Sequence, residues 1–109
     1  GGWDLSDNRQ LANAFYHATS FNQDIGEWDT SRVSSLMSVL DGASAFNQDI
    51  SKWDVDNIGD LRFAFRDTVS LSQDLSSMEF INMKGSPSWI SEGWHDGSAL
   101  TDEQLPNIF

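Results

Sequence analysis

A tandem repeat of constant spacing constrains this chain more than any other feature of its sequence. The stretch FNQDIGEWDTS at residues 21–31 returns as FNQDISKWDVD at residues 46–56, and a weaker copy, LSQDLSSMEFI, begins at Leu71. The three copies therefore start at positions 21, 46 and 71, in register with one another. A fixed period of this length is typical of proteins whose units stack, because one unit cannot bury its apolar face alone. The sequence predicts a stack in which equivalent residues of successive units lie above one another.

The repeat also predicts which side chains form the core of the stack. Apolar residues recur at the same positions of successive units, where we expect them to face inward. The predicted core consists of Phe21, Ile25, Trp28, Leu36, Phe46, Ile50, Trp53 and Leu61. We expect Trp28 and Trp53 to be largely buried, one above the other.

Each unit contains two kinds of segment. Val33, Leu36, Leu40 and Ala43 follow one another at steps of three or four, which is the spacing of a buried helix stripe, and Ser31 precedes them as a candidate N-cap. The FNQDI stretch is too short and too polar for a helix, so we expect an extended or strand-like edge there. Successive edges would pair as a short parallel ladder, with the helices stacked on the opposite side.

The end of the chain departs from the repeat. We divide the chain into a repeat region at 1–83 and an irregular capping or docking segment at 84–109, which carries Pro87 and Pro106. A terminal segment of different composition is expected to cover the apolar face of the last unit. Thr101 and Gln104 have the spacing of a capping box, which predicts a final short helix beginning at TDEQL.

The same segment also allows a binding interpretation, because aromatic residues are enriched at protein-binding hot spots. The first unit begins midway, so its outer face needs cover from further chain or from a neighbouring subunit. The candidate partner-binding residues are Trp3, Trp89, Trp94 and Phe109.

The composition narrows the classes of partner. Seventeen Asp and Glu residues against six Lys and Arg residues give a formal charge of −11, which disfavours nucleic acids and anionic lipid surfaces. Proteins, cations or basic surfaces remain, although acidity can also serve solubility alone. No apolar run approaches the roughly 18 to 20 residues of a membrane-spanning helix. The chain has no Cys, which excludes disulfides and thiolate metal sites.

The sequence carries no pattern of residues typical of catalysis. His17 and His95 have no second His at a ligand spacing, and GxSxG, glycine-rich phosphate loops and HExxH are missing. We therefore expect no enzymatic activity and no cofactor. The one charged column is Asp24, Asp49 and Asp74, whose carboxylates either accept backbone N–H groups within each turn or form a calcium ladder.

Residues 21–67 resemble the BspA-like repeat, a leucine-rich-repeat-related module of surface proteins with a pattern close to FNQDISxWDVSNVTDMxxMFxGAxx. The resemblance is weaker over 3–20 and 71–83 and ends there. It implies an α/β fold: a short right-handed, leucine-rich-repeat-like solenoid of about three repeat units, each a short strand or extended edge plus a short helix, with an irregular C-terminal cap. It also implies the absence of enzymatic activity.

These observations lead to one leading functional expectation and one alternative. The leading expectation is a non-catalytic protein-interaction or scaffold module, either a surface or adhesion domain or a peripheral subunit of a larger assembly. The alternative is a passive structural spacer in a longer surface protein. We expect a secreted, cell-surface or organelle-lumen location, with the targeting segment absent from the given chain.

Overall fold

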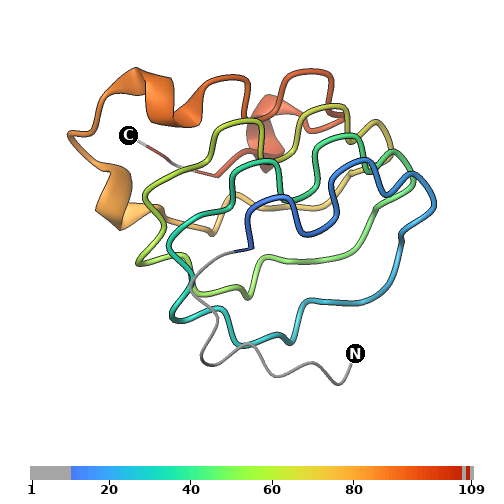
Figure 1. The fold of residues 1–109 in the computed structure, drawn as a ribbon, viewed down its shortest axis with the longest axis horizontal. Coiled ribbons are helices and arrows are strands. Elements are labelled where there is room, and N and C mark those ends of the chain that lie inside the picture. The colour runs from blue at the N-terminus through green and yellow to red at the C-terminus, as the bar shows by residue number, and fades with distance from the viewer. Residues whose placement is uncertain (1–10, 107, 109) are drawn as a thin grey trace.

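The computed structural model describes residues 11–106 and residue 108. Successive passes of the chain lie side by side as a stack (Figure 1). Each pass includes one compact stretch of reverse turns that we call a turn segment. The four turn segments are residues 11–18, 36–43, 61–68 and 91–98.

Backbone hydrogen bonds join each turn segment to the next. Alternate N–H groups of one segment donate to alternate carbonyl oxygens of the following pass, as in Leu36 N–H to Asp60 O at 2.9 Å and Leu40 N–H to Ala64 O at 2.9 Å. The same pattern joins the first segment to the second, beginning with Leu11 N–H to Ser35 O at 3.2 Å. The passes are therefore held in parallel register by their backbones.

The predicted helices are wrong, although the spacing that suggested them is reproduced. Within the second turn segment, N–H groups donate to carbonyls only three residues back, from Val39 to Leu36 and from Ala43 to Leu40. Ser38 and Gly42 have φ of 54° and 79°, in the left-handed region. A helix cannot continue through this arrangement, because alternate N–H groups are turned toward the neighbouring pass.

Tandem turns bury residues at the same steps of three and four as a helix would. The stripe expected for a helix is fully buried at Val33, Leu36, Leu40 and Ala43. Periodicity alone could not separate the two structures.

The predicted strand-like edges are also wrong. The described part of the chain contains no β-strand. Its one isolated β-bridge is parallel and joins Ser35 to Asp60. The backbone pairing therefore lies on the side where helices were expected. Three short 3-10 helices are the helical elements of the described residues: η1 (Ile81–Met83), η2 (Ser88–Ser91) and η3 (Asp102–Gln104). A solenoid of strand-plus-helix units is thus not what this chain forms.

The fourth turn segment follows the third with a longer spacing. Leu61 N–H donates to the carbonyl of Ile90 at 2.8 Å, which makes Ser91 the equivalent of Leu61, later in the chain than an unbroken period would place it. The extra residues lie around η2. The offset persists toward the end of the chain, where Ile108 follows Met78 at the same longer spacing and is also buried.

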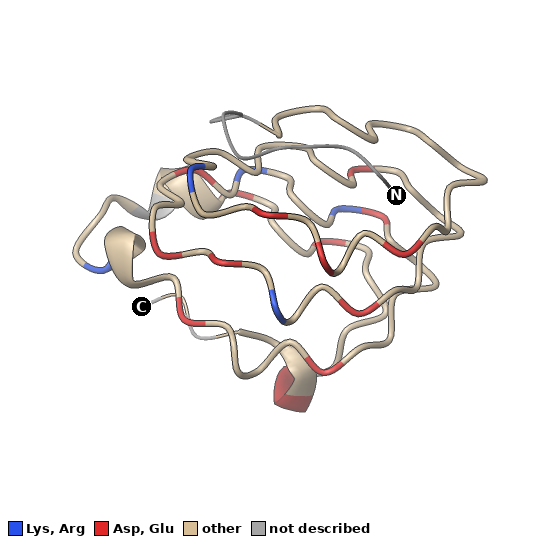
Figure 2. Cartoon of the chain, turned by 90° about the horizontal axis from the view of Figure 1, so that it is seen from below, with Lys and Arg blue, Asp and Glu red and all other residues tan. Residues whose placement is uncertain are grey.

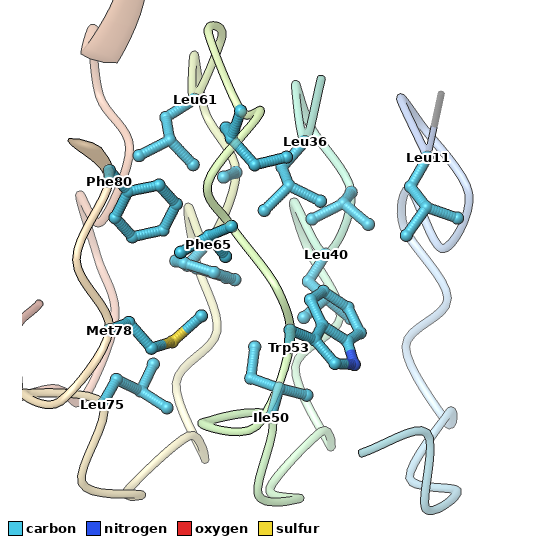
Figure 3. Close-up of a cluster of buried hydrophobic side chains, with 14 of the residues drawn as sticks. Leu11, Leu36, Leu40, Ile50, Trp53, Leu61, Phe65, Leu75, Met78 and Phe80 are labelled. Atoms are coloured by element: carbon cyan, nitrogen blue, oxygen red, sulfur yellow. The ribbon is translucent and has the colours of Figure 1, made fainter. Parts of the chain in front are cut away.

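The core runs through the middle of the stack. Leu11, Leu36 and Leu61 come from successive passes, and Ile50, Trp53, Leu75 and Met78 fill the opposite side (Figure 3). Of the expected core residues, those that are 4% exposed or less are Ile25, Leu36, Phe46, Ile50, Trp53 and Leu61. Trp28 was expected to be largely buried but is only half-buried, as is Phe21. Both belong to the first described pass.

No helix in the described part of the chain is long and apolar enough to cross a membrane.

Candidate protein-interaction surface

Side chains join the FNQD edges at residues 21–24 and 46–49 to the next pass, and at the last edge the backbone contributes as well, from Leu75 N–H to Gln104 O at 3.0 Å. Asn47 Oδ1 accepts a hydrogen bond from Ser72 N–H and another from Gln73 Nε2, both at 2.9 Å. Asn22 receives Asn47 N–H and Gln48 Nε2 in the same way, at 2.8 and 3.0 Å. We call these hydrogen bonds of Asn22, Asn47, Gln48 and Gln73 the amide ladder. The amide ladder fixes the register of this edge while leaving the edge open to solvent.

The column of aspartates forms local turns. Asp24, Asp49 and Asp74 each accept the backbone N–H two residues ahead through Oδ1, at 2.9–3.0 Å. Hydrogen bonds from Ser51 lower the pKa of Asp49, and hydrogen bonds from Ser76 lower the pKa of Asp74. One oxygen of each carboxylate therefore already has a donor. Among the residues described, no group of three or more His, Asp or Glu side chains gathers to hold a metal ion.

Asp and Glu residues recur on successive passes of the chain (Figure 2). They include Glu27, Asp29, Asp54, Asp56 and Glu79, all exposed. Lys52 pairs with Glu27 at 3.3 Å, but both side chains are largely exposed, at 72% and 79%, so the pair contributes little to stability.

A second surface combines arginines with aromatic rings. The guanidinium of Arg62 binds both carboxylate oxygens of Asp60, at 3.1 and 2.8 Å, and lies 5.3 Å from the centre of the Trp89 ring. Burial alone would raise the pKa of Asp60, but the hydrogen bonds and charge of Arg62 outweigh burial and hold that pKa below its usual value. Trp89, in η2, keeps 58% of its surface exposed.

Arg66 repeats this arrangement one turn further along. It binds both carboxylate oxygens of Asp41, at 3.0 and 2.7 Å, and lies 4.2 Å from the centre of the Phe63 ring. The side chain of Asp41 is 1% exposed, so Arg66 compensates a buried charge. These hydrogen bonds raise the pKa of Arg66. We call Arg62, Phe63, Arg66 and Trp89 the arginine–aromatic face.

The four candidate partner-binding residues have different outcomes. Trp89 is exposed and lies on the arginine–aromatic face. Trp94 is half-buried, packs against the core and meets the Phe65 ring edge to face at 6.1 Å. Trp3 and Phe109 lie outside the described residues.

Sequence reasoning missed both arginines and Phe63. One signal was present, because Asp41 and Arg66 occupy the same position of successive units and have opposite charges. When the residues at one repeat position have opposite charges in successive units, an ion pair between neighbouring passes is indicated. The i, i+2 spacing of Asp60 and Arg62 carries no comparable signal, because its geometry depends on the turn.

The histidines do not come together. His17 is exposed and stacks on Tyr16 with ring centres 3.9 Å apart, while His95 is half-buried and meets Trp94 edge to face at 4.5 Å. Each therefore has an aromatic neighbour that accounts for its position.

Repeated turn segments, a continuous core and side-chain ladders between successive units define a tandem-repeat protein of stacked turns. The chain belongs to the family described as "Mycoplasma protein of unknown function, DUF285", whose model matches residues 1–96. No curated protein and no solved structure matches the chain.

Proposed function

We propose that the chain is a non-catalytic protein-interaction or scaffold module of the BspA-like type, acting as a surface or adhesion domain or as a peripheral subunit of a larger protein complex. The observation that carries this proposal is Trp89, which is 58% exposed beside Arg62. Trp and Arg are the residues most enriched at binding hot spots.

The electrostatics of the arginine–aromatic face support a protein partner. Arg62 and Arg66 are each paired with a carboxylate, so they offer little free positive charge for a phosphate backbone. Their ion pairs hold the guanidinium planes in place against Trp89 and Phe63. A face that is preorganised in this way loses little side-chain entropy on binding.

The resemblance to BspA-like surface proteins, together with the charge of −11, supports a secreted, cell-surface or organelle-lumen location. The partner would be another protein, with no role for nucleic acid or a cofactor.

The test is isolation of the native protein with its partners, followed by identification of the contact by cross-linking. Trp89→Ser should weaken the recovered complex at least tenfold, since loss of a hot-spot side chain costs about 2 kcal/mol or more. Ile81→Ser is the matched control, because Ile81 is a comparably exposed apolar residue, at 47%. A protein that recovers no partner, or equal loss in both variants, would favour the passive spacer.

A further inference from the structure

The residues that lengthen the last spacing form a local insertion in one unit. Met83 still occupies the position of Ile58 in the preceding unit, and each donates its N–H to the carbonyl three residues earlier. Ser91 takes the position of Leu61 only after several extra residues, so the insertion lies between Met83 and Ser91 and includes η2. Insertions in single repeats form loops on one face of a stack, and that face is often the one that binds.

The insertion places Trp89 against the side of the stack and not only against its last pass. The guanidinium of Arg62, which lies 5.3 Å from the centre of the Trp89 ring, belongs to the third pass. Arg62 and Arg66 have a neighbouring pass on both sides, and their side chains still keep 35% and 37% of their surface exposed. The arginine–aromatic face is therefore accessible along the side of the stack, and the access of the two arginines does not depend on the ends.

Two exposed carboxylates lie beside the two ion pairs of this face. Phe63 N–H donates to Glu92 O at 2.9 Å, which places Glu92 next to Arg62, and Asp67 directly follows Arg66. Hydrogen bonds from the paired carboxylates raise the pKa of both arginines, and the charges of Glu92 and Asp67 add to that effect. Each guanidinium thus has two carboxylates near it, so the face carries an excess of negative charge although it contains two arginines.

We propose that the arginine–aromatic face binds a basic segment of the partner protein, with an Arg or Lys side chain over the exposed part of the Trp89 ring and its charge near Glu92. Trp is the side chain that attracts cations best through its ring face, and surrounding carboxylates favour a basic partner over an acidic one. The pairing of Arg62 with Asp60 offsets the charge of the one cation already on the ring. This inference rests on the proposed function, because it names the chemistry of the partner for the same face.

The first experiment titrates the chain with three synthetic peptides of Gly and Ser in which every third residue is Arg, Gln or Glu. NMR follows the indole N–H signals, and Trp89→Phe identifies the signal of Trp89. The Arg peptide should shift this signal and bind at least about fivefold more tightly than the Gln peptide. The Glu peptide should cause no shift. Equal binding of the Arg and Gln peptides, or no shift of the Trp89 signal at millimolar Arg peptide, would overturn the proposal.

Matched charge variants separate this site from general attraction, since a chain of charge −11 attracts any cation. Asp67→Asn with Glu92→Gln removes two charges from the face and should weaken binding of the Arg peptide at least about threefold. Asp56→Asn with Glu79→Gln makes the same two kinds of change at exposed residues outside the turn segments and should have a smaller effect. Equal weakening in the two double variants would show diffuse attraction and would overturn the proposal.

Variants of Trp89 test the contact with the ring. Trp89→Ser should abolish the preference for the Arg peptide over the Gln peptide, while Trp89→Phe should keep part of it, because Phe attracts cations less strongly than Trp. An unchanged preference in Trp89→Ser would contradict the proposal. A native partner recovered through Trp89, from a chain that binds the Arg and Gln peptides equally, would overturn the basic segment and leave the interaction module standing. Failure to recover a native partner would contradict the proposed function and would not alter the peptide result.

Discussion

The indole Nε1–H of Trp53 donates a 2.9 Å hydrogen bond to the carbonyl oxygen of Ile25, 28 residues earlier in the chain. The bond is buried, and it joins two passes beside the edge that is linked by the side chains of Asn22 and Gln48. Trp53 therefore serves both as an apolar core residue, 4% exposed, and as the polar link between FNQD edges.

Truncating Trp53 should remove both contributions. We expect Trp53→Ala to lower the free energy of unfolding by roughly 3 to 5 kcal/mol, because it leaves a large cavity. Trp53→Phe keeps much of the apolar volume and loses the bond to Ile25, so we expect a smaller total loss, of which the hydrogen bond accounts for about 0.5 to 1.5 kcal/mol. Urea unfolding measures both values. Equal losses in the two variants would show that the indole N–H, and not the ring volume, dominates.

The amide ladder predicts a measurable cost at an exposed residue. Asn47→Ala removes the acceptor of Ser72 N–H and Gln73 Nε2, and we expect a loss of about 1 to 2 kcal/mol. Gln23→Ala is the control, because Gln23 is exposed and makes no side-chain hydrogen bond within the described residues. Equal thermal stability of the two variants would show that water replaces the ladder at no cost.

Gly26 and Gly59 do not have a positive φ. Alanine substitutions at these two positions therefore test the close packing of neighbouring passes without straining the backbone. A Cβ atom at Gly26 would clash with the backbone carbonyl oxygen of Asp49, whereas one at Gly59 would meet only Asn82 Nδ2, at 3.5 Å. We expect Gly26→Ala to destabilise the fold by about 1 to 3 kcal/mol, because the rigid backbone of the next pass must move. Gly59→Ala should be neutral or stabilise the fold by up to about 1 kcal/mol. Chemical denaturation of both variants decides the matter, and an unperturbed Gly26→Ala would contradict the close contact between passes.

The aspartate turns predict how the stability of the fold changes as the pH is lowered. The pKa values of Asp49 and Asp74 are lowered in the folded chain, so the unfolded chain binds more protons and stability rises with pH in this range. Their contribution should be fully present above the ordinary carboxyl pKa of about 4 and should be lost as the pH falls through the lower, folded values. Asp49→Asn with Asp74→Asn keeps the acceptor oxygens but cannot titrate, so its stability should fall less between pH 5 and 2. An identical slope for the natural and double-variant chains would contradict this assignment.

Calcium should leave the melting temperature unchanged. In each of Asp24, Asp49 and Asp74, one carboxylate oxygen already accepts a hydrogen bond from a backbone N–H group. Saturation at a hundred times the dissociation constant would add about 2.7 kcal/mol, which a thermal melt with and without a chelator detects. An increase of several degrees in the melting temperature on adding calcium would instead support the calcium ladder.

The sequence by itself determined the stacking of units, the period and most of the core. Phe46 and Leu36 could be placed inside because a residue that recurs at a fixed interval meets its equivalents in neighbouring units, whatever the local backbone does. For the aspartate column the sequence left two interpretations, a local turn and a calcium ladder, and the hydrogen bonds of Asp24, Asp49 and Asp74 in the structure are those of the local turn.

Only the tertiary structure decided how the backbone of each unit is built. Steps of three and four along Val33, Leu36, Leu40 and Ala43 fit a helix and a run of reverse turns equally well. The turns prevail here because Leu36 and Leu40 N–H groups find acceptors at Asp60 and Ala64 on the adjacent pass. The arginine–aromatic face has the same origin, since the Arg66 and Asp41 pair exists only when successive passes lie side by side. Hydrogen bonds of this range depend on where the whole chain runs, which no short window of sequence contains.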